Sequence, residues 1–149
     1  MYRRILVATD GSALAGKGVD AGLALAAALK ASVVLVAVSE PWQDVYPGDP
    51  NGMALSCELR DAYRAARLAE GERVLGVARA RADALDLAVD TIYVRDRAPA
   101  DAILDTARTQ GVDLVVMASH GRSGLQKWLL GSQTQAVIVR GTLPVLVVR

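Results

Sequence analysis

Short continuous apolar runs alternate along this chain with longer segments in which apolar residues recur at helical spacing. Such a run is typical of a strand buried on both faces, as in a parallel sheet covered by helices. The runs predict five strands, which are Arg4–Ala8, Val33–Val38, Val89–Val94, Leu114–Ala118 and Val145–Val148. Because strands and helices alternate, the pattern predicts an α/β fold with an open parallel sheet and crossover helices.

The first two helices are predicted from amphipathic spacing. The first follows Ser12, a suitable N-cap, and its apolar face is Ala15, Val19, Leu23, Ala26 and Leu29. Three glycines lower its intrinsic propensity, so packing on the sheet must stabilise it. The second helix runs from about Leu55 to Leu85, with an apolar band of Leu59, Ala62, Ala66, Val74, Ala78, Ala82 and Leu85.

Two shorter helices complete the pattern. One starts near Pro99, which suits a first helical turn, buries Ile103, Leu104 and Ala107, and stops at Gly111. The other spans Gln133–Val139. The one irregular stretch, Glu40–Met53, is rich in Pro and Gly and follows the second strand. No internal repeat or linker interrupts the chain, so we expect one domain over residues 1–149.

Composition agrees with that fold and limits the classes of molecule that the protein could bind. Hydrophobic residues make up 52% and aromatics 4%, which indicates a core of Ala, Val, Leu and Ile. A net charge of +1 gives no broad basic surface for nucleic acid or an anionic membrane. No apolar stretch is long enough to span a bilayer, so we expect a soluble cytoplasmic protein. The single Cys57 excludes an internal disulfide, and we expect it to be partly buried.

The segment Val112–Ser132 carries the most specific chemistry. An apolar strand leads into a loop with Gly121 and Gly124, which permit positive φ and close backbone approach. Gly131-Ser132 then places a hydroxyl and N–H groups at the start of a helix, an arrangement that favours an anion. Arg122 and Lys127 could add charge-assisted bonds to phosphate. The alternative is an ordinary strand-helix connection in which Ser132 is only an N-cap.

These residues resemble the universal stress protein family. The strand is followed by Ser-His-Gly-Arg, nine residues from Arg122 to Leu130, and Gly131-Ser132, which is similar to the family's nucleotide-binding signature. The first strand with its turn, Arg4–Ser12, and the last strand, Leu143–Val148, resemble the corresponding family segments in order. The first glycine of the signature is Ala118 here.

The resemblance implies an adenine-nucleotide alpha-hydrolase-like fold with strand order 3-2-1-4-5 and helices on both faces. It implies ATP, or a related adenine nucleotide, with Mg²⁺ or Mn²⁺ between the first and fourth strands. The implied nucleotide-binding residues are Thr9, Asp10, Val38, Met117, Ala118, Gly121, Arg122, Gly131, Ser132, Gln133 and Thr134.

Three of these residues have expected roles of their own. Asp10 would accept hydrogen bonds from a ribose hydroxyl or help to hold the divalent cation, unless it only makes an Asx turn. Val38 would meet the adenine edge through its backbone. Gly131 would be needed for a positive φ or for a close contact at the phosphates.

Competing motifs are weaker. Gly11–Gly18 nearly spells a Walker A loop, but Gly18 stands where the Mg²⁺-ligating Ser or Thr belongs, so Lys17 is better interpreted as an exposed helix residue. Asp96 invites comparison with a phospho-acceptor receiver domain, but a single acid follows the first strand, and Asp96 fits an exposed turn. His120 lacks an oriented partner or nucleophile, which favours local packing over catalysis.

The resemblance implies an adenine-nucleotide-binding protein with a stress-response or signalling role, in which nucleotide occupancy alters partner choice. Two alternatives stay open, a nucleotide-free dimeric interaction module and a weak ATPase or phosphotransfer enzyme. The apolar strand Val145–Val148 would expose its edge if it lies at the side of the sheet. We therefore expect a homodimer that pairs this strand with its copy.

Overall fold

The computed structural model describes residues 1–42, 52–120 and 130–149, with the backbone alone for 52–56. Its strands are β1 (Arg4–Ala8), β2 (Ser32–Val38), β3 (Val89–Val94), β4 (Leu114–Ala118) and β5 (Val145–Val148). Its helices are α1 (Ala13–Leu29), α2 (Gly52–Asp83), α3 (Pro99–Thr109) and α4 (Ser132–Arg140). The strands form one parallel sheet in the order β3-β2-β1-β4-β5, which confirms the predicted fold and topology.

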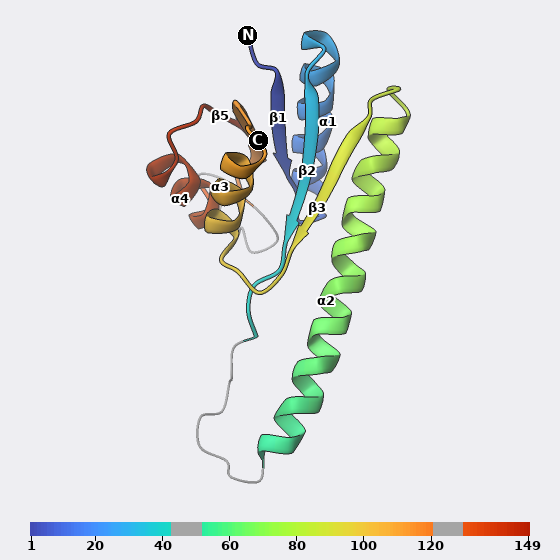
Figure 1. The fold of residues 1–149 in the computed structure, drawn as a ribbon, viewed down its shortest axis with the longest axis vertical. Helices are drawn as coiled ribbons and strands as arrows, with labels where there is room; N and C mark the ends of the chain where they lie inside the picture. Colours follow the sequence, from blue (N-terminus) through green and yellow to red (C-terminus); the bar gives the residue numbers. More distant parts are fainter. Residues whose placement is uncertain (43–51, 121–129) are drawn as a thin grey trace.

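Two helices cover each face of the sheet. Helices α1 and α2 lie on one face and α3 and α4 on the other (Figure 1). Side chains alternate along the central strand β1, so Ile5 and Val7 pack under α1 and α2, whereas Leu6 packs under α3 and α4. These three residues have no exposed surface, as expected for a doubly covered central strand.

Helix α1 begins where the sequence predicts. The Ser12 hydroxyl accepts a hydrogen bond from the Ala15 N–H at 3.2 Å, which is the expected N-cap. The predicted face is buried at Ala15, Val19, Leu23 and Ala26, and Leu29 packs at its margin. At Gly22 a Cβ would lie 2.6 Å from Val7 Cγ2, so glycine there allows α1 to approach β1 closely.

Helix α2 corrects the predicted packing. Of its predicted band, Val74, Ala78 and Ala82 are buried, but Leu59 is 50% exposed and Ala62 and Ala66 are exposed. The predicted helix end at Leu85 is wrong, because α2 ends at Asp83, and Leu85 in the turn beyond it is 50% exposed. The 32 residues of α2 span about 48 Å, whereas a strand of six residues spans about 20 Å. The amino-terminal half therefore has no sheet to pack on.

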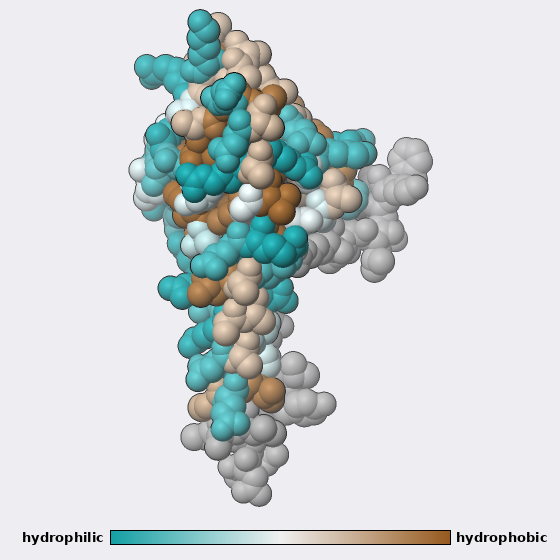
Figure 2. Space-filling model, turned by 90° about the vertical axis from the view of Figure 1, so that its right-hand side faces the viewer, coloured by the Kyte–Doolittle hydropathy of each residue, from teal (hydrophilic) through white to brown (hydrophobic). Residues whose placement is uncertain are grey.

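The figures show this projection directly. The lower half of α2 extends beyond the sheet in Figure 1, and Figure 2 shows it as a narrow column below the body of the molecule. Cys57 lies on this half and is exposed, which corrects the expectation that it is partly buried. Among the described residues, none of the helices combines the length and apolar character required to cross a bilayer.

Asp113 holds the amino-terminal end of β1 in place through hydrogen bonds. The Asp113 carboxylate, just before β4, accepts hydrogen bonds from the N–H groups of Arg3 at 2.8 Å and Arg4 at 3.0 Å. Burial alone would raise the pKa of the Asp113 carboxyl, but these N–H groups outweigh burial and hold that pKa below its usual range.

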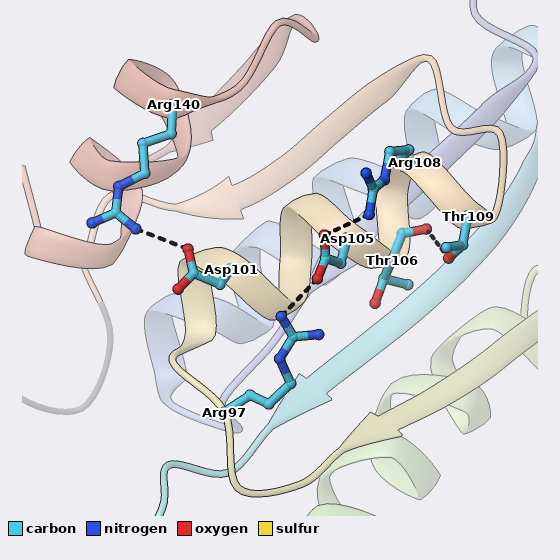
Figure 3. Close-up of polar contacts among 7 residues, drawn as sticks. All are labelled: Arg97, Asp101, Asp105, Thr106, Arg108, Thr109 and Arg140. Carbon is cyan, nitrogen blue, oxygen red and sulfur yellow. Dashed lines mark hydrogen bonds and ion pairs between the residues drawn. The ribbon is translucent and has the colours of Figure 1, made fainter.

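Polar side chains join α3 to α4. Arg140 donates to Asp101 at 2.8 Å, which links the end of α4 to the first turn of α3 (Figure 3). Asp105 accepts from Arg97 at 2.6 Å and from Arg108 at 3.1 Å. All these pairs are largely exposed, so they orient the helices more than they stabilise them.

Candidate functional site

A cavity of about 490 Å³ lies beyond the carboxyl ends of β1, β2 and β4. That volume is within the range of small-molecule sites. Strand β1 has β2 as its neighbour on one side and β4 on the other, so the strand order changes direction at β1. The cavity therefore lies at the switch point, where open α/β sheets bind ligands.

Most of the predicted nucleotide-binding residues line this one cavity. They are Thr9, Asp10, Val38, Met117, Ala118, Gly131, Ser132, Gln133 and Thr134. Gly121 and Arg122, with Lys127, lie outside the described residues. The residues predicted from the sequence come from the ends of three strands and the start of one helix, and the fold places them around one cavity.

The Val38 backbone faces the gap beyond the end of β1. The Thr9 N–H donates to the Val36 carbonyl at 2.9 Å, so the polar backbone groups of Val36 point toward β1. Along a strand, alternate residues present their N–H and C=O to the same side, and Val38 follows Val36 by two positions. Val38 therefore offers a neighbouring donor and acceptor, the pattern that recognises the edge of a nucleobase.

Helix α4 points its amino-terminal turn at the same cavity. Its N-cap is Gly131, and no side chain caps the first turn. Ser132 is thus the first helical residue, which corrects the interpretation of Ser132 as the N-cap. The backbone N–H groups of an uncapped first turn lack partners within the helix and, together with the helix dipole, attract an anion.

Gly131 is required for close packing. Its φ is −58°, so the proposed positive φ is wrong, because any residue adopts this conformation. A Cβ on Gly131 would lie 3.0 Å from His120 Cα and 3.1 Å from the Ser119 carbonyl oxygen. The Gly131 N–H donates to that carbonyl at 2.6 Å, which holds the start of α4 against the end of β4.

Two side chains near the start of α4 are engaged within the fold. The Thr134 hydroxyl is buried and donates to the Ala118 carbonyl at 2.9 Å. The Gln133 Oε1 accepts from the Ala100 N–H at 3.0 Å, in the first turn of α3, where the N-cap Ala98 offers no side-chain oxygen. These bonds position α4, and they reduce what the two side chains can offer a ligand.

Asp10 makes the Asx turn that the sequence left open. Its Oδ1 accepts from the Ser12 N–H at 3.0 Å, and Asp10 also lines the cavity. Gly11 follows with φ +77°, a left-handed conformation that favours glycine. Helix α1 then starts at Ala13, which places Gly16 and Lys17 in a regular helix and excludes an open Walker A loop there.

His120 borders the cavity from the end of β4. Its Nδ1 lies 3.1 Å from the Ser119 Oγ, and Ser119 is buried. This local contact agrees with the packing role that the sequence favours. Within residues 1–42, 52–120 and 130–149, no group of three or more His, Cys, Asp or Glu could hold a metal ion.

One wall of the cavity was missed by the sequence analysis. Tyr63, Arg67, Glu70 and Gly71 of α2, with Tyr93 of β3, line the side that faces α2. A Cβ on Gly71 would overlap the Tyr93 ring, and the Tyr93 hydroxyl donates to the Arg67 carbonyl at 2.7 Å. The available signal was Tyr63 and Arg67 at i, i+4 spacing with Gly71 one turn further on.

Comparison with known proteins adds a consistent family assignment. The model of the universal stress protein family matches residues 1–149. Universal stress protein YxiE of Bacillus subtilis is 34% identical over 150 residues, covering 100% of both chains. This chain is also similar to the structure of MJ0577 from Methanocaldococcus jannaschii, with a TM-score of 0.77, 28% identity and coverage of 99% and 96% of the two chains.

A third relative was solved with a ligand. The structure of a universal stress protein in complex with cAMP matches with a TM-score of 0.72 and 28% identity, and the match covers 99% of this chain and 97% of that one.

Proposed function

The chain belongs to the universal stress protein family, and on this premise we propose that it binds an adenine nucleotide in the cavity beyond β1, β2 and β4. One observation carries the proposal. The uncapped start of α4 and the Val38 backbone line the same cavity, so one ligand can meet an anion site and a base-recognition edge together. The relative that was solved with cAMP supports the choice of an adenine nucleotide.

In this proposal each part of the nucleotide has its own partner. The adenine base forms hydrogen bonds with the Val38 backbone. It packs on apolar side chains on the face of the sheet that α3 and α4 cover, among them Met117 and Ile103. The ribose hydroxyls donate to Asp10. The phosphates accept from the N–H groups of Ser132 and Gln133 at the start of α4, and the Ser132 hydroxyl adds a further donor.

ATP with Mg²⁺ or Mn²⁺ is the ligand we propose. The cation would be held by phosphate oxygens, which are ligands of the kind these metals prefer, and holding the cation is the alternative role of the Asp10 carboxylate to accepting from the ribose. Gly121 and Arg122 stay predicted phosphate contacts. We infer that nucleotide occupancy alters partner choice, with at most slow hydrolysis of ATP.

Assembly is the second part of the proposal. Strand β5 lies at the edge of the sheet, where the described chain leaves its outer side unpaired. Leu146 of β5 is 38% exposed, and Ile138 and Val139 of α4 are 44% and 76% exposed. A two-fold pairing of β5 with its copy would satisfy the edge and cover these side chains.

Thermal unfolding with and without nucleotide tests the proposal. Millimolar ATP with Mg²⁺ should raise the Tm, because a ligand that binds only the folded state stabilises it. GTP should raise it less, since its base reverses the donor and acceptor that face Val38. Mass spectrometry of co-purifying small molecules identifies the physiological nucleotide, and a turnover assay separates binding from hydrolysis. An unchanged Tm with every adenine nucleotide would favour the interaction module instead.

A further inference from the structure

A second polar site adjoins the cavity on the α2 side. A depression of about 30 Å³ is lined by Ser39, Arg64, Arg67, Tyr93, Arg95 and Asp96, and we call these six residues the arginine corner. Three of them, Ser39, Arg67 and Tyr93, also line the large cavity, so the two spaces adjoin. Helices α2 and α4 cover opposite faces of the sheet, so the corner and the start of α4 lie on opposite sides of the strand ends.

The Arg67 guanidinium is held in place by an aromatic ring. Its Cζ lies 5.1 Å from the centroid of Tyr63, which itself meets the edge of Trp42 at 5.0 Å between ring centroids. A cation–π contact of this kind leaves the charge of the guanidinium in place. Arg67 is therefore positioned without losing its capacity to bind an anion.

The other two arginines come from α2 and from the turn after β3. Arg64 Nε lies 3.5 Å from Asp96 Oδ2, which orients this guanidinium. Asp96 has φ +52°, and the turn is held by the Arg97 N–H, which donates to the Ser39 carbonyl at 3.1 Å. In the described part of the chain, neither Arg67 nor Arg95 has an ion pair to a carboxylate.

The charges at the corner do not cancel. Three guanidinium groups face one carboxylate, that of Asp96. Glu70 of α2, which lines the adjoining cavity with Arg67 and Glu40, pairs with Arg73 through two bonds of 2.8 Å and 3.0 Å. The Ser39 hydroxyl can donate to an oxyanion, whereas the Tyr93 hydroxyl already donates to the Arg67 carbonyl. The corner thus combines donors from α2 and from the residues just after β2 and β3 with an excess of positive charge.

We propose that the arginine corner is an anion subsite that binds a phosphate group. Guanidinium forks match the geometry of phosphate oxygens, and so small a depression admits one such group and excludes a whole nucleotide. The group comes from inorganic phosphate or from a phosphorylated ligand that spans the large cavity. The proposal stands independently of nucleotide binding at α4.

Side-chain NMR of the arginine Nε–H signals tests the subsite. Inorganic phosphate is titrated against chloride at constant ionic strength, which separates binding from screening. The Nε–H signals of Arg67 and Arg95 should shift and saturate, and that of Arg79, an exposed arginine further along α2, should not. Arg95→Gln should weaken the titration seen at Arg67 about tenfold, because it removes one charged fork. Arg79→Gln is the matched control and should leave that titration unchanged.

A parallel titration with ATP identifies the source of the phosphate. Arg95 lines the corner but not the large cavity, so shifts at Arg95 that saturate together with nucleotide binding indicate one ligand spanning both sites, and shifts with inorganic phosphate alone indicate a separate small anion. Both results support the subsite. Shifts at Arg67 and Arg95 no larger than those at Arg79, in either titration, overturn it. A protein that fails to bind ATP still gives a readable phosphate titration, so the two proposals fail separately.

Discussion

At the scale of single residues, Gly131 offers the sharpest test of the nucleotide site. Its φ of −58° suits valine, so Gly131→Val does not strain the backbone, but the added carbon lies 3.0 Å from His120 Cα. We expect this variant to lose ATP binding. Ser132→Ala should cost about 1 kcal/mol, roughly a fivefold weaker Kd, for one lost hydrogen bond. Isothermal titration measures both, and a Gly131→Val protein that binds as tightly as the wild type would refute the proposed phosphate position.

Asp113 gives stability that depends on pH. Its pKa is lowered by bonds that exist only in the folded state, so its contribution is complete above the unfolded pKa of about 4 and is lost as pH falls through the lower folded value. Asp113→Asn should therefore destabilise the protein at pH 7, and the difference from the wild type should shrink below about pH 4. Urea unfolding across pH 3 to 7 measures this, with exposed Asp61→Asn as the control. A constant difference at all pH values would exclude the carboxylate as the cause.

At the scale of elements, two glycines of α2 should respond to the same substitution with opposite signs. At Gly71 a Cβ would overlap the Tyr93 ring, whereas at Gly76 nothing lies within 4 Å. Gly71→Ala should destabilise by about 1–3 kcal/mol, because the ring must move and its bond to the Arg67 carbonyl must break. Gly76→Ala should stabilise by about 0.5–1 kcal/mol through helix propensity. Urea midpoints decide this, and two shifts of the same sign would contradict the close α2–Tyr93 contact.

The elements also show where prediction from sequence succeeds and where it stops. Strands were predicted to within a residue, as at β2, which begins at Ser32 and not at Val33, because an apolar run reports burial on both faces directly. The residues from Leu59 to Leu85 were predicted as one apolar band, but apolar spacing carries no information on whether a partner extends far enough to bury all of it. Likewise, Ser132 is of a residue type that favours the N-cap position. Only the backbone geometry shows that Gly131 occupies the N-cap of α4.

The candidate site divides in the same way. Residues on the strand ends and the start of α4 were proposed because their segments resemble those of the family. The α2 wall was not, since Tyr93 meets Gly71 only when two elements far apart in sequence pack together.

At the scale of the whole molecule, the unpaired edge of β5 determines the expected assembly. Leu146→Arg places a charge among the exposed apolar residues of β5 and α4, so it should convert the proposed dimer to a monomer. Leu59→Arg is the matched control, because Leu59 is exposed on the projecting half of α2, far from β5 along the fold. Light scattering after size exclusion measures the mass. A wild-type monomer at about 10 μM would exclude this dimer as a stable species.

The hydrogen bond from the Ala100 N–H to the Gln133 side chain links the stability of the fold to the affinity of the anion site. Gln133 belongs to the first turn of α4, and its side chain accepts a hydrogen bond from the first turn of α3. Gln133→Glu keeps the acceptor and adds a negative charge beside two helix amino termini, which should raise the Tm. The same charge would repel a phosphate at α4, so ATP affinity should fall. Glutamine at this position would then be a compromise, a neutral residue that leaves fold stability below its maximum and leaves the anion site open. Parallel measurements of Tm and Kd on this variant test that trade-off, and a change of both in the same direction would argue against it.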